Sequence, residues 1–154
     1  MRKICTDAEK TLSDDYFFNY NIQKKSVFTN TLEDYAIMTV DTSIKISASA
    51  IIVISTTARS VFYVAKYRPK CPVITPIRLC RRARQSNLFR GVFPLFVPGK
   101  VTDEWYEDNN TRIHLAIEYG KRKDFIKSGD TVVILFDWGK VFAATKSICV
   151  MNIK

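Results

Sequence analysis

The chain has 154 residues, of which 47% are hydrophobic and 25% charged, and its net charge is +9. These values are typical of one globular domain and argue against a disordered or low-complexity protein. The longest apolar run, around residues 48–54, is too short to span a bilayer, and charges occupy the N-terminal positions where a signal peptide needs an apolar centre. We therefore expect a cytoplasmic protein without a membrane segment.

The four cysteines lie far apart, form no CxxC pair and are accompanied by one histidine, which argues against a zinc site and indicates reduced thiols. The positive net charge favours anionic partners. In the most basic segment, residues 78–90, the arginines recur at three- and four-residue spacings around Ala83 and Leu88. We interpret them as the solvated face of an amphipathic helix, with a nucleic-acid-binding surface as the less favoured alternative.

Two regions differ in pattern. Residues 1–27 predict a helical start, followed by the aromatic stretch Tyr16 to Phe18 and a connection. Residues 28–154 predict an alternation of helices and strands. In chain order we expect a helix from Asn30, a strand over 50–54, a helix over 59–66, a strand over 71–77, a helix over 79–89, a strand over 92–97, a long helix capped by Thr102 or Asp103, a strand over 131–136 and a strand over 148–153.

The helix from Asn30 is predicted by a capping pattern, with Glu33 three residues later, and by an apolar stripe at Ala36, Val40 and Ile44. Strands that are apolar throughout and alternate with amphipathic helices predict a mainly parallel sheet covered on both faces. The 137–147 connection is too short for a helical crossover, so the last two strands are expected to be antiparallel. The predicted fold class is therefore a three-layer αβα sandwich with a mostly parallel five-stranded sheet. Pro76 is expected to remove one hydrogen bond from this sheet.

A cluster of hydroxyls follows the first strand. Ser55, Thr56 and Thr57 end that strand and open a helix that carries Arg59 and Ser60. In an open α/β sheet, ligands bind outside the carboxyl ends of strands, where hydroxyls and the N–H groups of a helix N-terminus could hold a phosphate. The alternative is plain helix capping, which needs only one Ser or Thr.

A second candidate is the pair Trp105 and Arg112, which lie seven residues apart on one face of the long predicted helix. An aromatic ring and a guanidinium could hold a sugar phosphate. The alternative is that Trp105 is a core residue and that Arg112 pairs with Asp108, and the pattern by itself favours this alternative. The Walker, GxGxxG and GxSxG motifs are absent from the sequence, so residue patterns alone identify no enzyme.

Several motifs in order resemble the C-terminal domain of pyruvate kinase: AIIVISTTARS, VAKYRPKCPVI, ARQSNLFRGVFP, the helix from DEWYEDNN to KSGD, and TVVILFDW. ICTDAEKTL resembles the last helix of that enzyme's catalytic barrel, so residues 1–27 resemble the link between barrel and domain. The resemblance implies an α/β sandwich that binds an allosteric effector, often fructose bisphosphate, and helps to build a tetramer.

The resemblance also assigns the two candidates above to one site. It implies that Ser55, Thr56, Thr57, Arg59 and Ser60 hold one phosphate of the effector, and that Trp105 and Arg112 contact the other. Ala58 stands where the family has glycine, and Val141 and Ala143 replace later glycines of the 137–147 loop. Bulkier residues restrict a loop that must approach a ligand closely, so we expect millimolar binding or none.

The family's catalytic lysine, its magnesium and potassium ligands and its nucleotide contacts belong to the barrel, and none matches a residue of this chain. We therefore expect this chain to be inactive alone and to hold no cofactor. The expected partners are a sugar bisphosphate, a second copy of the chain through the 102–124 helix or the last strand, or full-length pyruvate kinase subunits. Two alternatives are a fragment of a longer, active pyruvate kinase and a stand-alone basic module that binds polyanions or nucleic acid.

Overall fold

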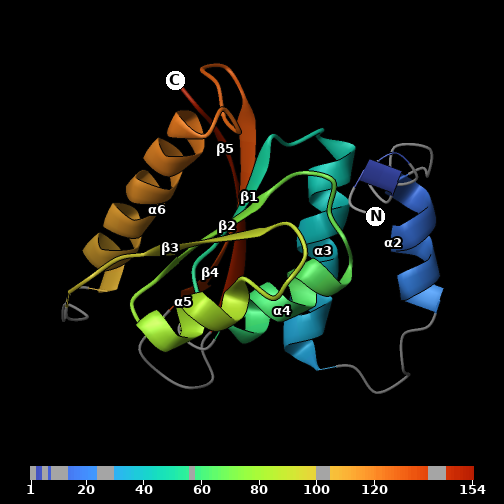
Figure 1. Ribbon diagram of the computed structural model, residues 1–154, viewed down its shortest axis with the longest axis horizontal. Helices are drawn as coiled ribbons and strands as arrows, with labels where there is room; N and C mark the ends of the chain where they lie inside the picture. Colours follow the sequence, from blue (N-terminus) through green and yellow to red (C-terminus); the bar gives the residue numbers. More distant parts are fainter. Residues whose placement is uncertain are drawn as a thin grey trace.

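A computed structural model of the chain describes residues 3–4, 7, 14–23, 30–55, 58–99, 105–138 and 145–154. Figure 1 shows its helices and strands, which in chain order are α2 (Asp14–Gln23), α3 (Thr31–Lys45), β1 (Ala50–Val53), α4 (Arg59–Lys66), β2 (Val73–Ile77), α5 (Cys80–Ser86), β3 (Val92–Phe96), α6 (Trp105–Arg122), β4 (Thr131–Trp138) and β5 (Thr145–Asn152). The predicted caps Thr102 and Asp103, and most of the predicted helix before residue 13, lie outside the described residues. Among those that are described, no helix is both long and apolar enough to cross a membrane.

The strands form one sheet in the order β3-β2-β1-β4-β5. The pairs β1–β2, β1–β4 and β2–β3 are parallel and β4–β5 is antiparallel, which confirms the predicted fold class. The chain runs from β1 outward to β3 and then returns to place β4 on the other side of β1. The strand order therefore reverses between β1 and β4, and such a switch point is where ligands bind in open α/β sheets.

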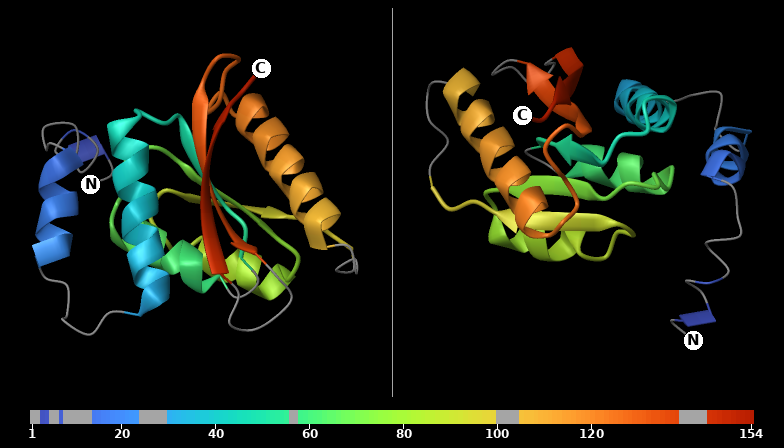
Figure 2. Two further views of the ribbon diagram at one scale, coloured as in Figure 1. Left: turned by 180° about the vertical axis from the view of Figure 1, so that it is seen from behind. Right: turned by 90° about the horizontal axis from the view of Figure 1, so that it is seen from above.

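Helices cover both faces of this sheet. Figure 2 shows α6 on one side of the sheet and α3 on the other, and right-handed crossovers place α4 and α5 on the α3 side. Alternate residues of β1 enter different cores: Ile51 and Val53 pack with the α3 and α4 side chains, whereas Ile52 and Ile54 pack with those of α6. Burial of both faces explains why β1 is apolar throughout.

Helix α3 starts as predicted, but Glu33 has a different role. Asn30 is the N-cap, and its side chain accepts a hydrogen bond from the Leu32 amide. The Glu33 carboxylate is buried and accepts hydrogen bonds from Lys66 Nζ at 2.6 Å and Tyr67 Oη at 2.8 Å. Glu33 thus joins α3 to the end of α4, and burial together with this bond raises the pKa of Tyr67.

The basic segment after β2 largely matches its predicted solvated face. Arg81, Arg84 and Arg90 are exposed, and Ala83 is buried. Leu88, which follows α5, is 84% exposed, so it does not extend the apolar face of that helix. Arg78 also departs from the solvated face, because its guanidinium pairs with Asp108 of α6 across the edge of the sheet.

Candidate functional site

Of the predicted hydroxyl cluster, Ser55 lies at the switch point of the sheet. Ser55 lies two residues after the end of β1 and is almost fully buried, whereas Thr56 and Thr57 lie outside the described residues. The N-cap of α4 is Ala58, whose methyl group offers no capping bond. The capping alternative therefore does not hold at the N-cap position itself. Free N–H groups in the first turn of a helix, with the positive end of its dipole, favour an anion there.

Ala58 sets the shape of this turn. Its backbone has φ 58° and ψ 4°, which is the left-handed region that glycine adopts at least cost. Ala58 therefore adopts the left-handed turn at the position where the resemblance leads us to expect glycine.

Strand β5 brings a cation to the same turn. Lys146 Nζ lies 3.4 Å from Ser60 Oγ, and Ser60 is buried in the first turn of α4 while Arg59 is exposed beside it. Burial lowers the pKa of Lys146 to about 8, so its ammonium is charged at neutral pH. A lysine, an arginine and a helix N-terminus together can bind a phosphate.

Sequence reasoning missed Lys146 because it lies 86 residues from Ser60. A signal for it was present, since the two-residue period of a strand places Lys146 on the same face as Ile148. Ile148 packs against the core formed by α3 and α4. A lysine on that face lies on the side of the sheet that α3 and α4 cover.

Arg112 is buried close to Ser55. Its Nη2 donates to the carbonyl oxygen of Pro76 at 2.6 Å and lies 3.5 Å from that of Ser55. Its Nη1 lies 3.8 Å from Asp108, so the predicted Arg112–Asp108 pairing is confirmed. The structure thus brings Arg112 and Ser55 together, although the guanidinium of Arg112 faces protein carbonyls.

Among the described side chains, the ion pairs around Asp108 leave an excess of positive charge. Arg78 and Arg112 share this one carboxylate. Burial and the nearby charge of Arg78 lower the pKa of Arg112 to about 10, so both guanidiniums stay charged at neutral pH. Within the described part of the chain, neither Nε atom has a hydrogen-bond partner. The carboxyl ends of β1 and β2 therefore carry a buried positive charge that favours a nearby anion.

Trp105 is the first residue of α6, and its side chain lies outside the described residues. The predicted contact of Trp105 and Arg112 with one ligand therefore stays a prediction. The described residues contain no group of three or more His, Cys, Asp and Glu side chains that could hold a metal ion.

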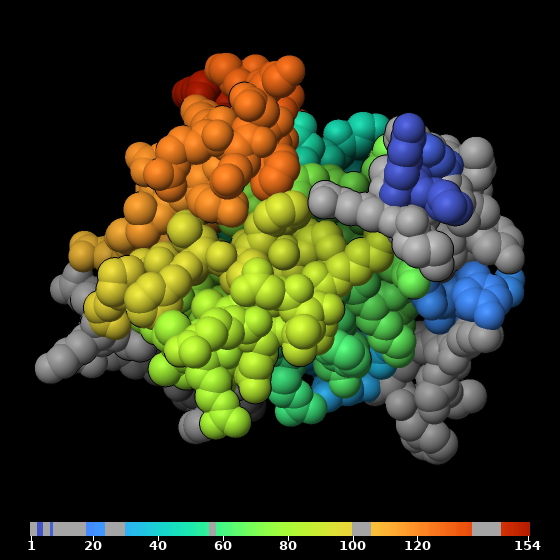
Figure 3. All heavy atoms as spheres, viewed as in Figure 1, coloured from blue at the N-terminus to red at the C-terminus, as the bar shows by residue number. Residues whose placement is uncertain are grey.

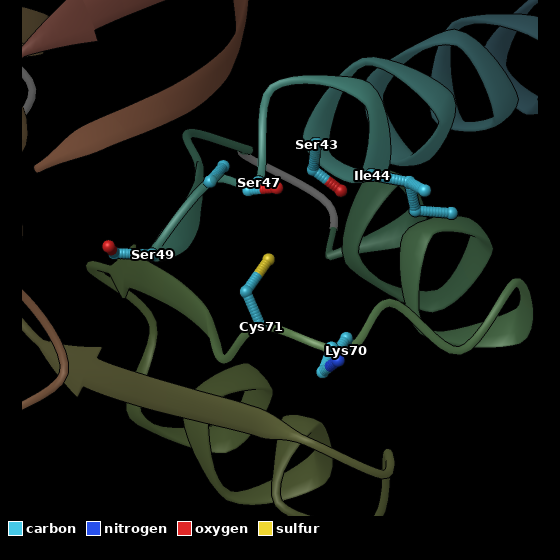
Figure 4. Close-up of a pocket in the computed structure, with 7 residues that line it drawn as sticks. Ser43, Ile44, Ser47, Ser49, Lys70 and Cys71 are labelled. Atoms are coloured by element: carbon cyan, nitrogen blue, oxygen red, sulfur yellow. The ribbon is translucent and has the colours of Figure 1, made fainter. Parts of the chain in front are cut away.

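A separate cavity of about 390 Å³ lies at the opposite edge of the sheet, before β1 and β2 begin (Figure 4). Figure 4 shows the Cys71 thiol directed toward the hydroxyl side of the cavity, where Ser43, Ser47 and Ser49 lie. Burial raises the pKa of Cys71 to about 11, although a hydrogen bond with Ser43 partly offsets this effect. The thiol is thus protonated at neutral pH and is a weak nucleophile.

The chain is similar to known proteins over most of its length. A family model described as "Pyruvate kinase, alpha/beta domain" matches residues 33–151. Pyruvate kinase PKLR of Homo sapiens is 33% identical over 150 residues, which cover 97% of this chain and 26% of the human protein. Pyruvate kinase 1 of Saccharomyces cerevisiae is 41% identical, and pyruvate kinase 2 of Candida glabrata 38% identical, each over 105 residues. Each of these two matches covers 68% of this chain and 21% of the relative, so the chain spans about a quarter or less of the relatives' length.

Proposed function

Since the chain belongs to the pyruvate kinase family through its alpha/beta domain, we propose that it binds a sugar bisphosphate and acts in regulation or assembly rather than in catalysis. The three relatives described above are named as kinases for the whole of their length. This chain covers only 21–26% of that length. Phosphoryl transfer needs metal ions and positioned charges, and we expect the chain to supply none of them by itself.

One observation carries the proposal: Lys146 meets Ser60 at the N-terminus of α4, beside the switch point of the sheet. A phosphate placed there would accept bonds from the Lys146 ammonium and from free N–H groups of α4. A charge-assisted hydrogen bond contributes about 1.5–3 kcal/mol and a helix terminus about 0.3–1 kcal/mol. The sum approaches the roughly 4 kcal/mol that millimolar affinity requires.

The second phosphate is the less supported half of this site. The resemblance assigns it to Trp105 and Arg112, and Arg112 would have to exchange the Pro76 carbonyl oxygen for a phosphate oxygen. The single phosphate at α4 is therefore the part of the proposal that the test addresses first.

The test is a titration of the ¹⁵N-labelled chain with fructose 1,6-bisphosphate, followed by the amide resonances of Ala58, Arg59 and Ser60. We expect millimolar affinity in the wild type and binding at least about tenfold weaker in Lys146→Met. Lys121→Met is the matched control, because Lys121 is exposed and contacts the C-terminal residue Lys154, far from α4 in the sequence. Unshifted amides at 20 mM ligand would contradict the proposal, and so would equal affinity in Lys146→Met. Turnover of phosphoenolpyruvate and ADP by the purified chain would refute the non-catalytic role.

A role in assembly is favoured by a different observation. β5 is the last strand of the sheet that the described residues form, and its residues Cys149, Val150 and Met151 are exposed. An eight-residue edge strand with exposed apolar side chains can pair with another strand. Light scattering should show a dimer that Val150→Lys dissociates, whereas a wild-type monomer at 0.5 mM would contradict this role.

A further inference from the structure

The outer side of α5 and the end of the neighbouring strand β3 carry three large apolar side chains that are strongly exposed. They are Leu79, the N-cap of α5, Leu88, which follows α5, and Phe96, the last residue of β3, with exposed fractions of 51%, 84% and 48%. Figure 3 shows α5 and β3, in yellow-green to yellow, on the face toward the viewer. We call these three side chains, together with Arg81 and Arg84, the α5 surface.

The end of β3 and helix α5 lie on the same side of the sheet. Val92 of β3 belongs to the core formed by α3 and α4, and the two-residue period of a strand places Phe96 on that same side. The crossover from β2 to β3 puts α5 there as well, and α5 packs against β3. β3 is an edge strand of the sheet that the described residues form, so Phe96 and α5 together border this edge.

Arg81, Arg84 and Leu88 follow one another along the outward face of α5. The helical turn continues past the end of α5, because the amides of Asn87 and Leu88 donate to carbonyl oxygens three residues earlier. Residues three and four positions apart in a helix share a face. Ala83 is buried on the opposite face. The outward face therefore carries two arginines and ends in an exposed leucine.

The positive charge of the α5 surface has no acidic residue near it in the sequence. No Asp or Glu occurs between Asp41 and Asp103, so α4, β2, α5 and β3 contain none. Arg81 and Arg84 are both exposed. The α5 surface thus joins apolar side chains to an excess of positive charge, and a partner that fits it must carry negative charge and also accept apolar groups.

We propose that the α5 surface binds the surface of a membrane that contains anionic lipids. Its two arginines lie among the negatively charged headgroups, while Leu88 and Phe96 enter the boundary between the headgroups and the acyl chains. Peripheral membrane binding of this kind depends on electrostatic attraction together with burial of apolar area. The α5 surface supplies both.

The shape of the α5 surface favours a lipid layer over a protein segment or a nucleic acid. A bound peptide places its side chains in a groove or in pockets, but the groove between α4 and α5 is lined by other residues. Leu88 stands out from the protein instead. A single-stranded nucleic acid stacks its bases on a series of aromatic rings, whereas the α5 surface has one aromatic side chain, Phe96.

The test is cosedimentation of the full chain with phosphatidylcholine vesicles that contain about 30 mol% phosphatidylserine, at an ionic strength of about 0.1 M. We expect reversible binding to these vesicles and binding at least about tenfold weaker to phosphatidylcholine alone. Arg81→Gln combined with Arg84→Gln should weaken binding at least about tenfold, because each arginine near an anionic leaflet contributes about fivefold. The matched control is Lys121→Gln with Arg122→Gln, which removes two exposed cations from the last turn of α6.

Leu88→Ser tests the apolar part of the contact without a change in charge. We expect it to weaken binding at least about fivefold, whereas Leu88→Phe, which keeps a large apolar side chain, should bind as the wild type does. Met38→Ser is the matched control, because Met38 is 55% exposed and lies on α3. Circular dichroism verifies that each variant is folded.

Three results would overturn the proposal: equal binding to the two kinds of vesicle, unchanged binding of Leu88→Ser, or an equal loss in the α5 arginine variant and its control on α6. Tighter binding to oligo(dA) or to polyglutamate than to the anionic vesicles would also overturn it, and would indicate a nucleic-acid or acidic-protein surface. The α5 surface shares no residue with the proposed effector site, so the arginine variant should keep fructose bisphosphate binding. Failure of the effector site leaves this test unaffected.

Discussion

The Nη2 atom of Arg112 lies 2.6 Å from the carbonyl oxygen of Pro76 and donates a hydrogen bond to it. This bond joins α6 to β2 near the carboxyl end of that strand. β1 and β2 are paired through Ile52 and Ile74, after which the Thr75 hydroxyl donates to the carbonyl oxygen of Val53. Proline has no N–H to continue the pairing, so the Thr75 hydroxyl serves as the donor to the Val53 carbonyl oxygen.

Substitution of Arg112 by Met should therefore destabilise the chain without any ligand present. The variant loses a charge-assisted hydrogen bond to a buried carbonyl, so we expect the free energy of unfolding to fall by about 1.5–3 kcal/mol. Urea unfolding followed by circular dichroism measures the change. Arg122→Met, at an exposed position in the last turn of α6, is the control and should change stability by less than about 0.5 kcal/mol. Equal stability of the two variants would show that the Pro76 bond contributes little.

Ala58→Gly should stabilise the chain. Glycine relieves the left-handed backbone at φ 58°, and we expect a gain of about 0.5–1 kcal/mol in the free energy of unfolding. Ala83→Gly, in the middle of α5, should instead destabilise the chain by about 1 kcal/mol or more. Thermal unfolding of both variants measures the two effects, and a loss of stability in Ala58→Gly would contradict the expectation.

Tyr67→Phe should weaken the link between α3 and α4. The hydroxyl of Tyr67 donates to the buried Glu33 carboxylate, and its removal should cost about 1.5–3 kcal/mol of unfolding free energy. Tyr106→Phe, on the exposed face of α6, provides the comparison and should be neutral. Chemical denaturation of the two variants measures this difference. Identical midpoints of unfolding would argue against a stabilising role of the Tyr67–Glu33 hydrogen bond.

Binding of fructose bisphosphate should weaken as the pH rises from 7 to 9.5. The phosphates are already ionised at pH 7.5, whereas Lys146, with its pKa of about 8, loses its charge across this range. The affinity should therefore fall in the wild type and stay level in Lys146→Met. A parallel decrease in both proteins would place the titrating group elsewhere.

A rise in pH has opposite effects on ligand binding by Lys146 and on the contribution of Lys146 to the stability of the chain. Its pKa is lower in the folded chain than its ordinary value of 10.5, so the unfolded chain binds more protons between about pH 8 and 10.5. The contribution of Lys146 to stability therefore rises with pH across that window. Urea unfolding of wild type and Lys146→Met at pH 7.5 and 9.5 would detect the difference between the two slopes.

Cys71 should react more slowly with iodoacetamide than Cys80 and Cys149. Burial raises the pKa of Cys71 to about 11, whereas the other two side chains are exposed. Mass spectrometry of partially alkylated protein at pH 7.5 gives the three rates. Labelling of Cys71 at the same rate as Cys149 would show that its cavity opens readily to the reagent.

Local patterns predicted the order of the elements from α3 on, but α2 forms where an aromatic stretch and a connection were expected, and β5 begins at Thr145 instead of residue 148. The bounds of α4 match because its apolar spacing, Val61, Val64 and Ala65, is local, and all three side chains are buried. The antiparallel last pair followed from the length of its connection. The hydroxyl cluster was placed at a strand end by the same local reasoning, and Ser55 lies there.

Contacts between distant residues could not be predicted in this way. Glu33 fitted a capping pattern, yet its carboxylate binds Lys66 and Tyr67, 33 and 34 residues away. The pairing of Arg78 with Asp108 and the approach of Lys146 to Ser60 also depend on how helices and strands pack. Charge and periodicity indicate which side chains are available, but tertiary packing selects their partners.

Strand β5 begins beside α4 and is an edge strand of the sheet that the described residues form. If a ligand at Lys146 orders the start of this strand, the same free energy would favour pairing of its edge with a second chain. Thermodynamic linkage then requires reciprocity, so that dimer formation would tighten ligand binding by the factor by which the ligand tightens the dimer. A single short strand would be enough to couple the occupancy of the site to the oligomeric state.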